Sequence, residues 1–577
     1  METLEKDVEK RINDWLEGDY DEETKNAIRK LIDNKQTEEL TDAFYKDLEF
    51  GTGGLRGVMG VGSNRINKYT IGAATQGLSN YLKAQFPGDE IKVAIAHDNR
   101  NNATEFAQIV ADVFSANGIY VYYFDGLRPT PELSYAIREL NCKSGVMLTA
   151  SHNPREYSGY KVYWDDGGQI ISPHDKNIIE EVTGITDISD IQFEANPDRI
   201  EKIGEEFDRL FTDRLKQESL NPQIIQEQSD LSIVYSPIHG TGVKIIPMAL
   251  EKIGFTNIHL VEEQCVTDGN FPTVVYPNPE EKEAMTMALK KAEEVDADLV
   301  MATDPDADRV GIAVKNHSGE FVLLDGNQTG VLLFNYVLSQ WRQKGLLKGK
   351  EYIVKTIVTT YLIDKIARVK GVKCYNVLTG FKYIGALMTE LEGEATFIAG
   401  AEESYGYLVG DHVRDKDAVV ACNMIAEMTA YYKSRGKTLY ETLRDIYLEY
   451  GLYKEELVAL KKTGKKGAEE IAAIMKSYRE NPPAVLGGQE VIRIKDYLSS
   501  TEKNIRTGEE KAIDLPEANV MQFITEGEHI ISARPSGTEP KIKFYISVNT
   551  ELTNPDDYSR KEAELDELIR AMKEDLL

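Results

Sequence analysis

Short β-rich runs alternate with helical runs three times along this chain, and this alternation constrains the fold more than any other feature. The first unit reads as strands at 92–97, 120–124 and 145–150, separated by helices at 104–117 and 131–140. Strands joined by crossover helices form a parallel sheet covered by helices. The first unit therefore predicts an α/β domain.

The same pattern returns twice, with no detectable sequence identity between the copies. The predicted strands are at 232–235, 258–261, 298–302, 353–358, 372–375 and 396–399, and the helices are at 243–253, 280–295, 362–369 and 381–391. Past Gly451 the pattern changes to consecutive strands with flanking helices, which predicts an α+β domain. Three structurally repeated units and a different fourth one are expected.

We predict an α/β protein of three structurally similar α/β domains, with mixed or parallel sheets, and a C-terminal α+β domain around a central active-site cleft. The length of 577 residues suits about four domains of about 150 residues each. Apolar residues at helical spacing in the first 45 residues predict two amphipathic helices. The predicted divisions are a helical extension at 1–45, α/β domains at 46–210, 211–322 and 323–450, and the α+β domain at 451–577.

Charge and cysteine usage narrow the class of protein. The chain has 67 Lys and Arg against 96 Asp and Glu, a net charge of −29 that repels nucleic acids and anionic membranes. An anionic substrate therefore needs a local basic pocket. The four cysteines are scattered and form no CxxC pair, and the chain has no apolar leader and no apolar run long enough for a bilayer. We therefore predict a reduced, cytoplasmic protein with no nucleic-acid or membrane partner.

The first chemical motif is TASHNP, residues 149–154, at the end of a buried-looking strand. A hydroxyl just past the carboxyl end of a parallel strand, beside His152, lies where α/β sheets bind ligands. Ser151 is therefore a nucleophile candidate. The alternative is a serine that only caps a helix or closes a turn. Lys161, a cation that could reach the same pocket, favours the nucleophile.

The second motif is DPDADR, residues 304–309, again directly after an apolar strand. The carboxylates of Asp304, Asp306 and Asp308 alternate, so they can direct oxygens at one hard cation such as Mg²⁺. An EF-hand would need Gly and an acid where this chain has Arg309 and Lys315. A solvated acidic loop is the remaining alternative. Arg309 adds a positive group for an anion bound at the metal.

The third motif is AEESYG, residues 401–406, after the last strand of the third unit. Glu402 and Ser404 can exchange hydrogen bonds with neighbouring sugar hydroxyls, although alone the motif could be only a polar turn. Nearby Lys382 opens a predicted helix and could bind a phosphate or move a proton, or be one of many surface lysines.

The fourth motif is RPSGTEPK, residues 534–541, between two strands of the last domain. A phosphate cradle is favoured over an ordinary hairpin turn, because a turn has no need of the flanking basic residues. Its predicted phosphate ligands are Arg534, Ser536, Gly537, Thr538 and Lys541. The loop at 51–57 adds Arg56 among glycines, but it matches no phosphate-loop spacing.

Taken together, these four motifs resemble those of the α-D-phosphohexomutase family, in the family's order and one from each domain. Within the family, the branch of phosphoglucomutases and phosphopentomutases is most similar. The resemblance runs from about Gly51 to Ser547. The sugar motif begins Ala401-Glu402 where many relatives have Gly-Glu, a small departure.

The resemblance implies that Ser151 carries a phosphoryl group, and that Mg²⁺ is bound by Asp304, Asp306, Asp308 and a phosphoserine oxygen. It also implies interconversion of glucose 1-phosphate and glucose 6-phosphate, with glucose 1,6-bisphosphate as intermediate and activator. Glu402 would hold the 3- and 4-hydroxyls together with Ser404, and the basic motif would hold the phosphate that is not reacting. The general acid and base stay open among Lys161, His152, Lys382 and Arg56, and Lys161 is favoured because it is close to Ser151 along the chain.

Several alternatives remain at this point. The sugar could be mannose or a pentose, and the expected partners are small hexose phosphates, for a monomer or weak dimer. A haloacid-dehalogenase-like phosphatase also uses Asp-x-Asp with Mg²⁺, and there Asp304 would be phosphorylated. A non-catalytic sugar-phosphate sensor on the same scaffold is a third class.

Overall fold

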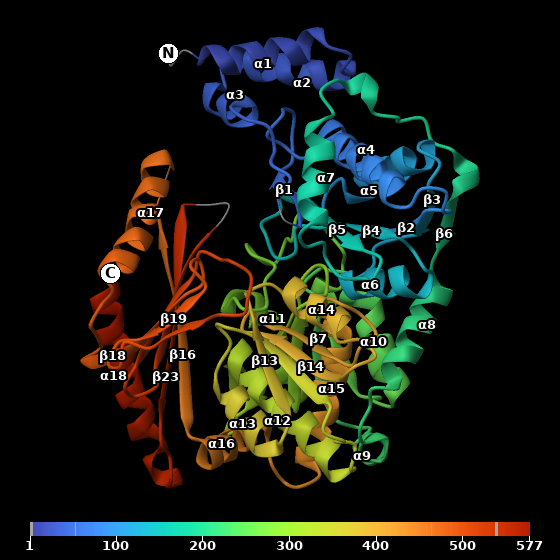
Figure 1. Ribbon diagram of the computed structural model, residues 1–577. Coiled ribbons are helices and arrows are strands. Elements are labelled where there is room, and N and C mark those ends of the chain that lie inside the picture. The colour runs from blue at the N-terminus through green and yellow to red at the C-terminus, as the bar shows by residue number, and fades with distance from the viewer. Residues whose placement is uncertain (1–3, 52, 463, 537–539) are drawn as a thin grey trace.

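The computed structural model describes residues 4–51, 53–462, 464–536 and 540–577 (Figure 1). Within these ranges the strands form four sheets, which follow one another along the chain. Three sheets combine parallel and antiparallel pairs and carry helices, and the fourth lies in a C-terminal unit at the left of Figure 1. The predicted fold class is confirmed.

The first sheet is built from residues 54–203. Its elements are β1 (Gly54–Val58), α4 (Lys68–Gln85), β2 (Lys92–His97), α5 (Ala103–Ala116), β3 (Tyr120–Phe124), α6 (Thr130–Glu139), β4 (Ser144–Leu148), β5 (Tyr157–Trp164), α7 (His174–Thr183) and β6 (Ile200–Ile203). The strand order is β1-β5-β4-β2-β3-β6. As predicted, β2 pairs in parallel with β3 and β4. The antiparallel β5 and β1 extend the sheet beyond the prediction.

The second sheet has the order β11-β10-β9-β7-β8. Its elements are α8 (Glu205–Lys216), α9 (Pro222–Glu227), β7 (Ile233–Ser236), α10 (Gly242–Ile253), β8 (Ile258–Leu260), α11 (Lys282–Val295), β9 (Leu299–Thr303), β10 (Val310–Lys315) and β11 (Phe321–Leu324). The parallel core β8-β7-β9 agrees with the prediction, and the antiparallel β10 and β11 are additional.

The third sheet has the order β13-β12-β14-β15. Its elements are α12 (Gly326–Gln343), β12 (Glu351–Thr356), α13 (Leu362–Lys370), β13 (Lys373–Val377), α14 (Phe381–Glu390), β14 (Thr396–Glu402), β15 (Gly406–Val409), α15 (Ala418–Lys433) and α16 (Leu439–Tyr450). α15 is buried along nearly its whole length, because it packs between the second and third sheets with contacts to β9, β15 and α10.

The C-terminal unit is an antiparallel sheet with two long helices. Its elements are β16 (Leu452–Lys461), α17 (Gly464–Glu480), β17 (Val485–Leu486), β18 (Gln489–Asp496), β19 (Thr501–Asn504), β20 (Glu510–Ala512), β21 (Met521–Thr525), β22 (Ile530–Pro535), β23 (Lys541–Thr550) and α18 (Tyr558–Leu576). The order is β16-β23-β22-β21-β18-β19-β20, with β17 beside β18. The chain enters this unit through Gly451, whose φ of 99° favours glycine.

The N-terminal extension contains three helices where the sequence analysis predicted two. They are α1 (Lys6–Glu17), α2 (Glu22–Asp33) and α3 (Thr37–Phe44). The third was missed because eight residues span only about two helical turns, too few for a clear periodicity. The extension packs through Trp15 and Phe44 against Tyr69 of α4.

Each predicted motif lies between two strands that pair antiparallel. The β4–β5 pair flanks residues 149–156, the β9–β10 pair 304–309, the β14–β15 pair 403–405 and the β22–β23 pair 536–540. In the three α/β sheets, the strand that enters the motif is parallel to its other neighbour. The first three motifs therefore occur at the carboxyl ends of parallel strands, the usual ligand-binding edge, whereas the fourth lies in an antiparallel sheet.

Two further features concern the molecule as a whole. One continuous apolar core connects all four sheets, and a smaller cluster joins Ile357 and Leu378 of the third unit to Tyr497 and Tyr545 of the fourth. Among the described residues, no helix combines the length and apolar character that crossing a membrane requires.

Candidate active site

The motifs meet at one cleft of about 630 Å³. The predicted site residues that line it are Arg56, Ser151, His152, Lys161, Asp308, Arg309, Glu402, Ser404 and Arg534. Asp304 and Asp306 are fully buried and bond to residues at the cleft. Lys382, Ser536 and Lys541 are not among the lining residues, and Gly537 and Thr538 lie outside the described residues.

Ser151 lies at the centre of the first motif and reaches across to the second. Its Oγ donates a hydrogen bond to Asp304 Oδ2 at 2.9 Å and lies 3.2 Å from His152 Nδ1. Its φ of 51° is in the left-handed region, which is unusual for a serine and raises the backbone energy. This conformation directs a 4% exposed hydroxyl at a carboxylate of another domain, which an ordinary capping serine does not need.

His152 is held neutral by its surroundings. Burial is the largest cause that lowers the pKa of His152, and the guanidinium groups of Arg309 and Arg56 lower it further. The pKa therefore lies well below its usual range. Both arginines line the cleft. The neutral imidazole adds no charge of its own, so the two arginines are the cations that an anion would meet on this side of the cleft.

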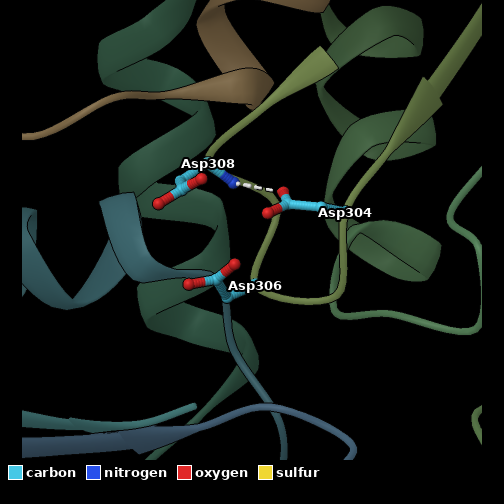
Figure 2. Close-up of side chains that lie close together, drawn as sticks. All are labelled: Asp304, Asp306 and Asp308. Carbon is cyan, nitrogen blue, oxygen red and sulfur yellow. Dashed lines mark hydrogen bonds between the residues drawn. The ribbon is translucent and has the colours of Figure 1, made fainter. Parts of the chain in front are cut away.

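The three aspartates of the second motif converge, as Figure 2 shows, and their oxygens lie within 4.8 Å of one another. Asp304 Oδ1 accepts hydrogen bonds from the Asp308 and Arg309 amides at 3.2 and 3.0 Å. Asp306 Oδ1 and Asp308 Oδ1 are buried without a hydrogen-bond partner among the described residues. Buried unpaired carboxylate oxygens are costly, and a hard cation would satisfy them. The residues therefore fit a divalent metal ion.

Two lysines face the aspartates from other domains. Lys161 Nζ lies 2.8 Å from Asp306 Oδ2 and 3.8 Å from Asp308 Oδ2. Lys416 Nζ lies 3.2 Å from Asp308 Oδ2 and 3.0 Å from Asp415 Oδ1. Although burial opposes its charge, Asp308 and Asp415 raise the pKa of Lys416 above its usual range. Lys416 was not predicted as a site residue, and its one signal in the sequence is an alternation of charges just before α15.

The second and third motifs contact each other directly. Arg309 pairs with Gly406 in an isolated β-bridge, and its Nη1 donates to Glu280 Oε1 at 2.9 Å. Glu402 is 5% exposed and accepts a hydrogen bond from the Gly380 amide at 2.9 Å. The adjacent Glu403 is a part-buried acceptor for two threonines, and burial raises its pKa to about 7.

The C-terminal unit supplies a basic edge. Arg534 of β22 and Lys543 of β23 are direct cross-strand partners, and both line the cleft. Two cations side by side suit a doubly charged phosphate. Lys543 was missed because it lies two residues past the motif. Lys541 begins β23, where its carbonyl accepts the Ser536 amide at 2.7 Å.

Lys382 of α14 is the one predicted proton-transfer candidate that does not line the cleft. Its Nζ is 5.3 Å from the centroid of the neighbouring Tyr383 ring, and burial lowers its pKa. The adjacent Phe381 and Gly380 line the cleft, whereas Lys382 does not. Of the predicted proton-transfer candidates, the structure brings together Lys161, His152 and Arg56.

A half-buried glutamate that lines the cleft predicts how stability depends on pH. Glu455 of β16 accepts a hydrogen bond from Ser547 at 3.0 Å, and burial, ahead of the nearby Asp325, raises its pKa from 4.5 to about 7. The folded protein therefore holds this proton more tightly than the unfolded chain. Stability from this group is fully present below pH 4.5 and is lost as pH rises towards 7.

We expect Glu455→Gln to become progressively more stable than the wild type as pH rises from 5 to 8, because the glutamine stays neutral. Urea unfolding midpoints of both proteins at pH 5 and pH 8 provide the measurement. Equal changes in the two midpoints would contradict the raised pKa.

Comparisons with known proteins agree with the geometry. Family models described as phosphoglucomutase/phosphomannomutase α/β/α domains I, II and III match residues 47–189, 209–319 and 325–450. A phosphoglucomutase of Staphylococcus haemolyticus is 37% identical over 91% of this chain and 95% of its own length. One of Staphylococcus aureus is 38% identical over 95% of this chain and 97% of its own.

Two solved structures have the same fold. A phosphoglucomutase/phosphomannomutase family protein from Burkholderia thailandensis matches with a TM-score of 0.62 at 18% identity, over 91% of this chain and 97% of its own. The open form of the phosphoglucomutase pp63/parafusin from Paramecium matches with a TM-score of 0.66 at 17% identity, over 92% and 96%.

Proposed function

The chain belongs to the phosphoglucomutase/phosphomannomutase family, and we propose that it is a phosphoglucomutase interconverting α-D-glucose 1-phosphate and glucose 6-phosphate. The observation that carries the proposal is the approach of the Ser151 hydroxyl to the carboxylate triad inside a cleft edged by Arg534 and Lys543. The curated relatives named phosphoglucomutase support the choice of sugar. Membership of this family argues against the haloacid-dehalogenase-like phosphatase.

In the proposed mechanism, Ser151 carries the phosphoryl group. The phosphorus–Oγ bond breaks while a bond forms to the 6-oxygen of glucose 1-phosphate; the hydroxyl proton passes to a base and Oγ is released. The resulting glucose 1,6-bisphosphate then reorients in the cleft, so that its two phosphates exchange places. Its 1-phosphoryl group then bonds to Ser151 Oγ, and the freed 1-oxygen takes up a proton, which leaves glucose 6-phosphate. Both halves use one nucleophile, so one cleft must accept the sugar in two orientations.

We assign the metal site to Asp304, Asp306 and Asp308, with a phosphoserine oxygen of Ser151 as a further ligand. When bound, Mg²⁺ would neutralise the charge that builds up on the moving phosphoryl group. The unpaired oxygens of Asp306 and Asp308 support this assignment. Oxygen donors alone suit a hard cation better than a softer one.

The remaining roles follow from position in the cleft. Arg309 is proposed to hold the phosphate at the metal, and Glu402 with Ser404 the 3- and 4-hydroxyls. The distant phosphate is assigned to Arg534, Ser536, Gly537, Thr538 and Lys541, joined by Lys543. For proton transfer we favour Lys161, which lies 2.8 Å from Asp306 in the centre of the site, over His152, Arg56 and Lys382.

Small hexose phosphates are the partners, glucose 1,6-bisphosphate is the activator, and the protein acts as a monomer or weak dimer. Four free cysteines suit the cytoplasm. We also propose domain divisions near 46, 211, 323 and 451, and the succession of four sheets along the chain supports four domains, although 211 falls within α8 and 323 within β11 of the second sheet.

One coupled assay tests the function. We expect kcat/KM for glucose 1-phosphate to exceed the values for mannose 1-phosphate and ribose 1-phosphate, and the rate to rise with added glucose 1,6-bisphosphate. A higher value for mannose or ribose phosphate would identify a different mutase of the family. No turnover of any of them by phosphorylated protein with Mg²⁺ would favour a sensor.

A further inference from the structure

Arg100, in the loop after β2, is the only described residue whose side chain forms hydrogen bonds along the whole phosphoserine motif. Its guanidinium is completely buried. It donates four hydrogen bonds to backbone carbonyl oxygens, those of Ser151 at 2.6 Å, Asn153 at 2.7 Å, Pro154 at 2.8 Å and Tyr157 at 2.9 Å. A rigid planar fork that reaches four carbonyls fixes the path of the entire turn.

Asp98 closes the network from the other side. Its Oδ2 lies 3.3 Å from Arg100 Nε and accepts a hydrogen bond from Thr149 Oγ1 at 2.6 Å. Thr149 Oγ1 in turn accepts the Ser151 amide at 2.8 Å. The amide and the carbonyl of Ser151 are therefore both held by the same buried ion pair.

The backbone of Ser151 needs such support. Its φ of 51° is a conformation that a residue with a Cβ atom adopts only where the surrounding structure determines it. That conformation aims Oγ at Asp304. If the carbonyls of the motif were released, the serine could relax to an ordinary backbone conformation and its hydroxyl would turn away from the metal loop.

The second domain covers this network. The ring centroid of Phe271 lies 5.4 Å from the Arg100 guanidinium, and Asn99 Nδ2 donates to Asp268 O at 3.1 Å. A Cβ atom on Gly269 would lie 2.4 Å from the Asn101 amide nitrogen, so the two loops approach as closely as glycine allows. The loop 268–271, which belongs to the same domain as the metal site, therefore covers Arg100.

We propose that Arg100, sealed by Phe271, is a positioning residue for phosphoryl transfer: it holds the strained backbone that aims Ser151. This inference rests on the proposed function, in which Ser151 is the phosphoryl carrier. Neither Arg100 nor Phe271 lines the cleft, so neither contacts the sugar phosphate. Loss of Arg100 lowers the rate of transfer and leaves substrate affinity unchanged.

The test is Arg100→Lys, which keeps a positive charge beside Asp98 but cannot reach four carbonyls. Per active site, titrated as phosphoserine, we expect kcat to fall by about 10²-fold, as a misplacement of about 1 Å costs, while KM for glucose 1-phosphate changes less than about threefold. Single-turnover transfer from phosphorylated Ser151 should slow equally. Arg479→Lys, which removes a guanidinium bound to Asp496 in the C-terminal sheet, is the matched control and should keep the wild-type rate.

A merely structural role would lower the melting temperature and the number of active sites, but not kcat per titrated site. A kcat within threefold of wild type would therefore overturn the proposal. Should Arg100→Lys fail to fold, Phe271→Leu provides the same readouts, and an unchanged kcat per site would again overturn it. Ser151→Ala distinguishes failure of the proposed function from failure of this inference. An active Ser151→Ala protein would refute the proposed function. An inactive Ser151→Ala protein together with an Arg100→Lys protein of wild-type kcat would refute only the role of Arg100.

Discussion

Ser151→Ala should lose mutase turnover by at least about 10⁴-fold while keeping its fold, because it removes the atom that carries the phosphoryl group. Alanine keeps the Cβ atom of the serine, so the left-handed backbone at residue 151 is no more strained than in the wild type. One hydrogen bond to Asp304 is lost, which costs about 1 kcal/mol. Steady-state assays with glucose 1-phosphate measure the loss of turnover. Mass spectrometry of the peptide that contains residue 151, after incubation with glucose 1,6-bisphosphate, measures the loss of the phosphoryl group.

Ser158→Ala is the matched control for this variant. Ser158 lies in β5 of the same domain, is equally inaccessible, and its hydroxyl is buried without a hydrogen-bond partner among the described residues. It should turn over at the wild-type rate and remain phosphorylated at Ser151. A Ser151→Ala protein with activity within tenfold of wild type would refute the assignment of the nucleophile.

The parallel strands could be predicted from sequence because most of their residues are buried and read as apolar runs. The crossover helices could be predicted because their buried apolar residues recur at helical spacing. Strand 92–97, helix 362–369 and strand 120–124 match β2, α13 and β3 to within a residue. The antiparallel neighbours could not be predicted in this way. β5, for example, mixes Tyr, Ser, Gly and Lys, and its pairing with β4 depends on long-range contacts that local periodicity does not contain.

The site shows the same division. Motifs with several chemical groups in one short stretch, such as the aspartates of 304–308, reveal themselves in the sequence. Residues that reach the site singly do not. Lys416 and Lys543 look like ordinary charged residues until folding brings them to the cleft, and Arg100 acts through backbone carbonyls, which leave no trace in a sequence motif.

Asp306→Asn should lower kcat by about 10²-fold or more and move the Mg²⁺ titration to higher concentration. The substitution keeps the shape of the side chain but removes one of three negative charges that the proposed metal needs. It also removes the nearer carboxylate partner of Lys161, at 2.8 Å, and leaves only Asp308 at 3.8 Å. Calorimetric titration of Mg²⁺ should show weaker binding, which separates a metal effect from a loss of Lys161 positioning.

Asp298→Asn tests whether the effect belongs to the triad and not to the loss of any carboxylate in this domain. Asp298 precedes β9 just as Asp304 follows it, and its Oδ2 pairs with Lys433 at 2.6 Å, away from the cleft. Because it offers no oxygen to the triad, its neutralisation should change neither kcat nor the Mg²⁺ midpoint. If Asp306→Asn bound Mg²⁺ as the wild type does, the carboxylates would have a different partner, and the ion pairs to Lys161 and Lys416 would become the reason for their burial.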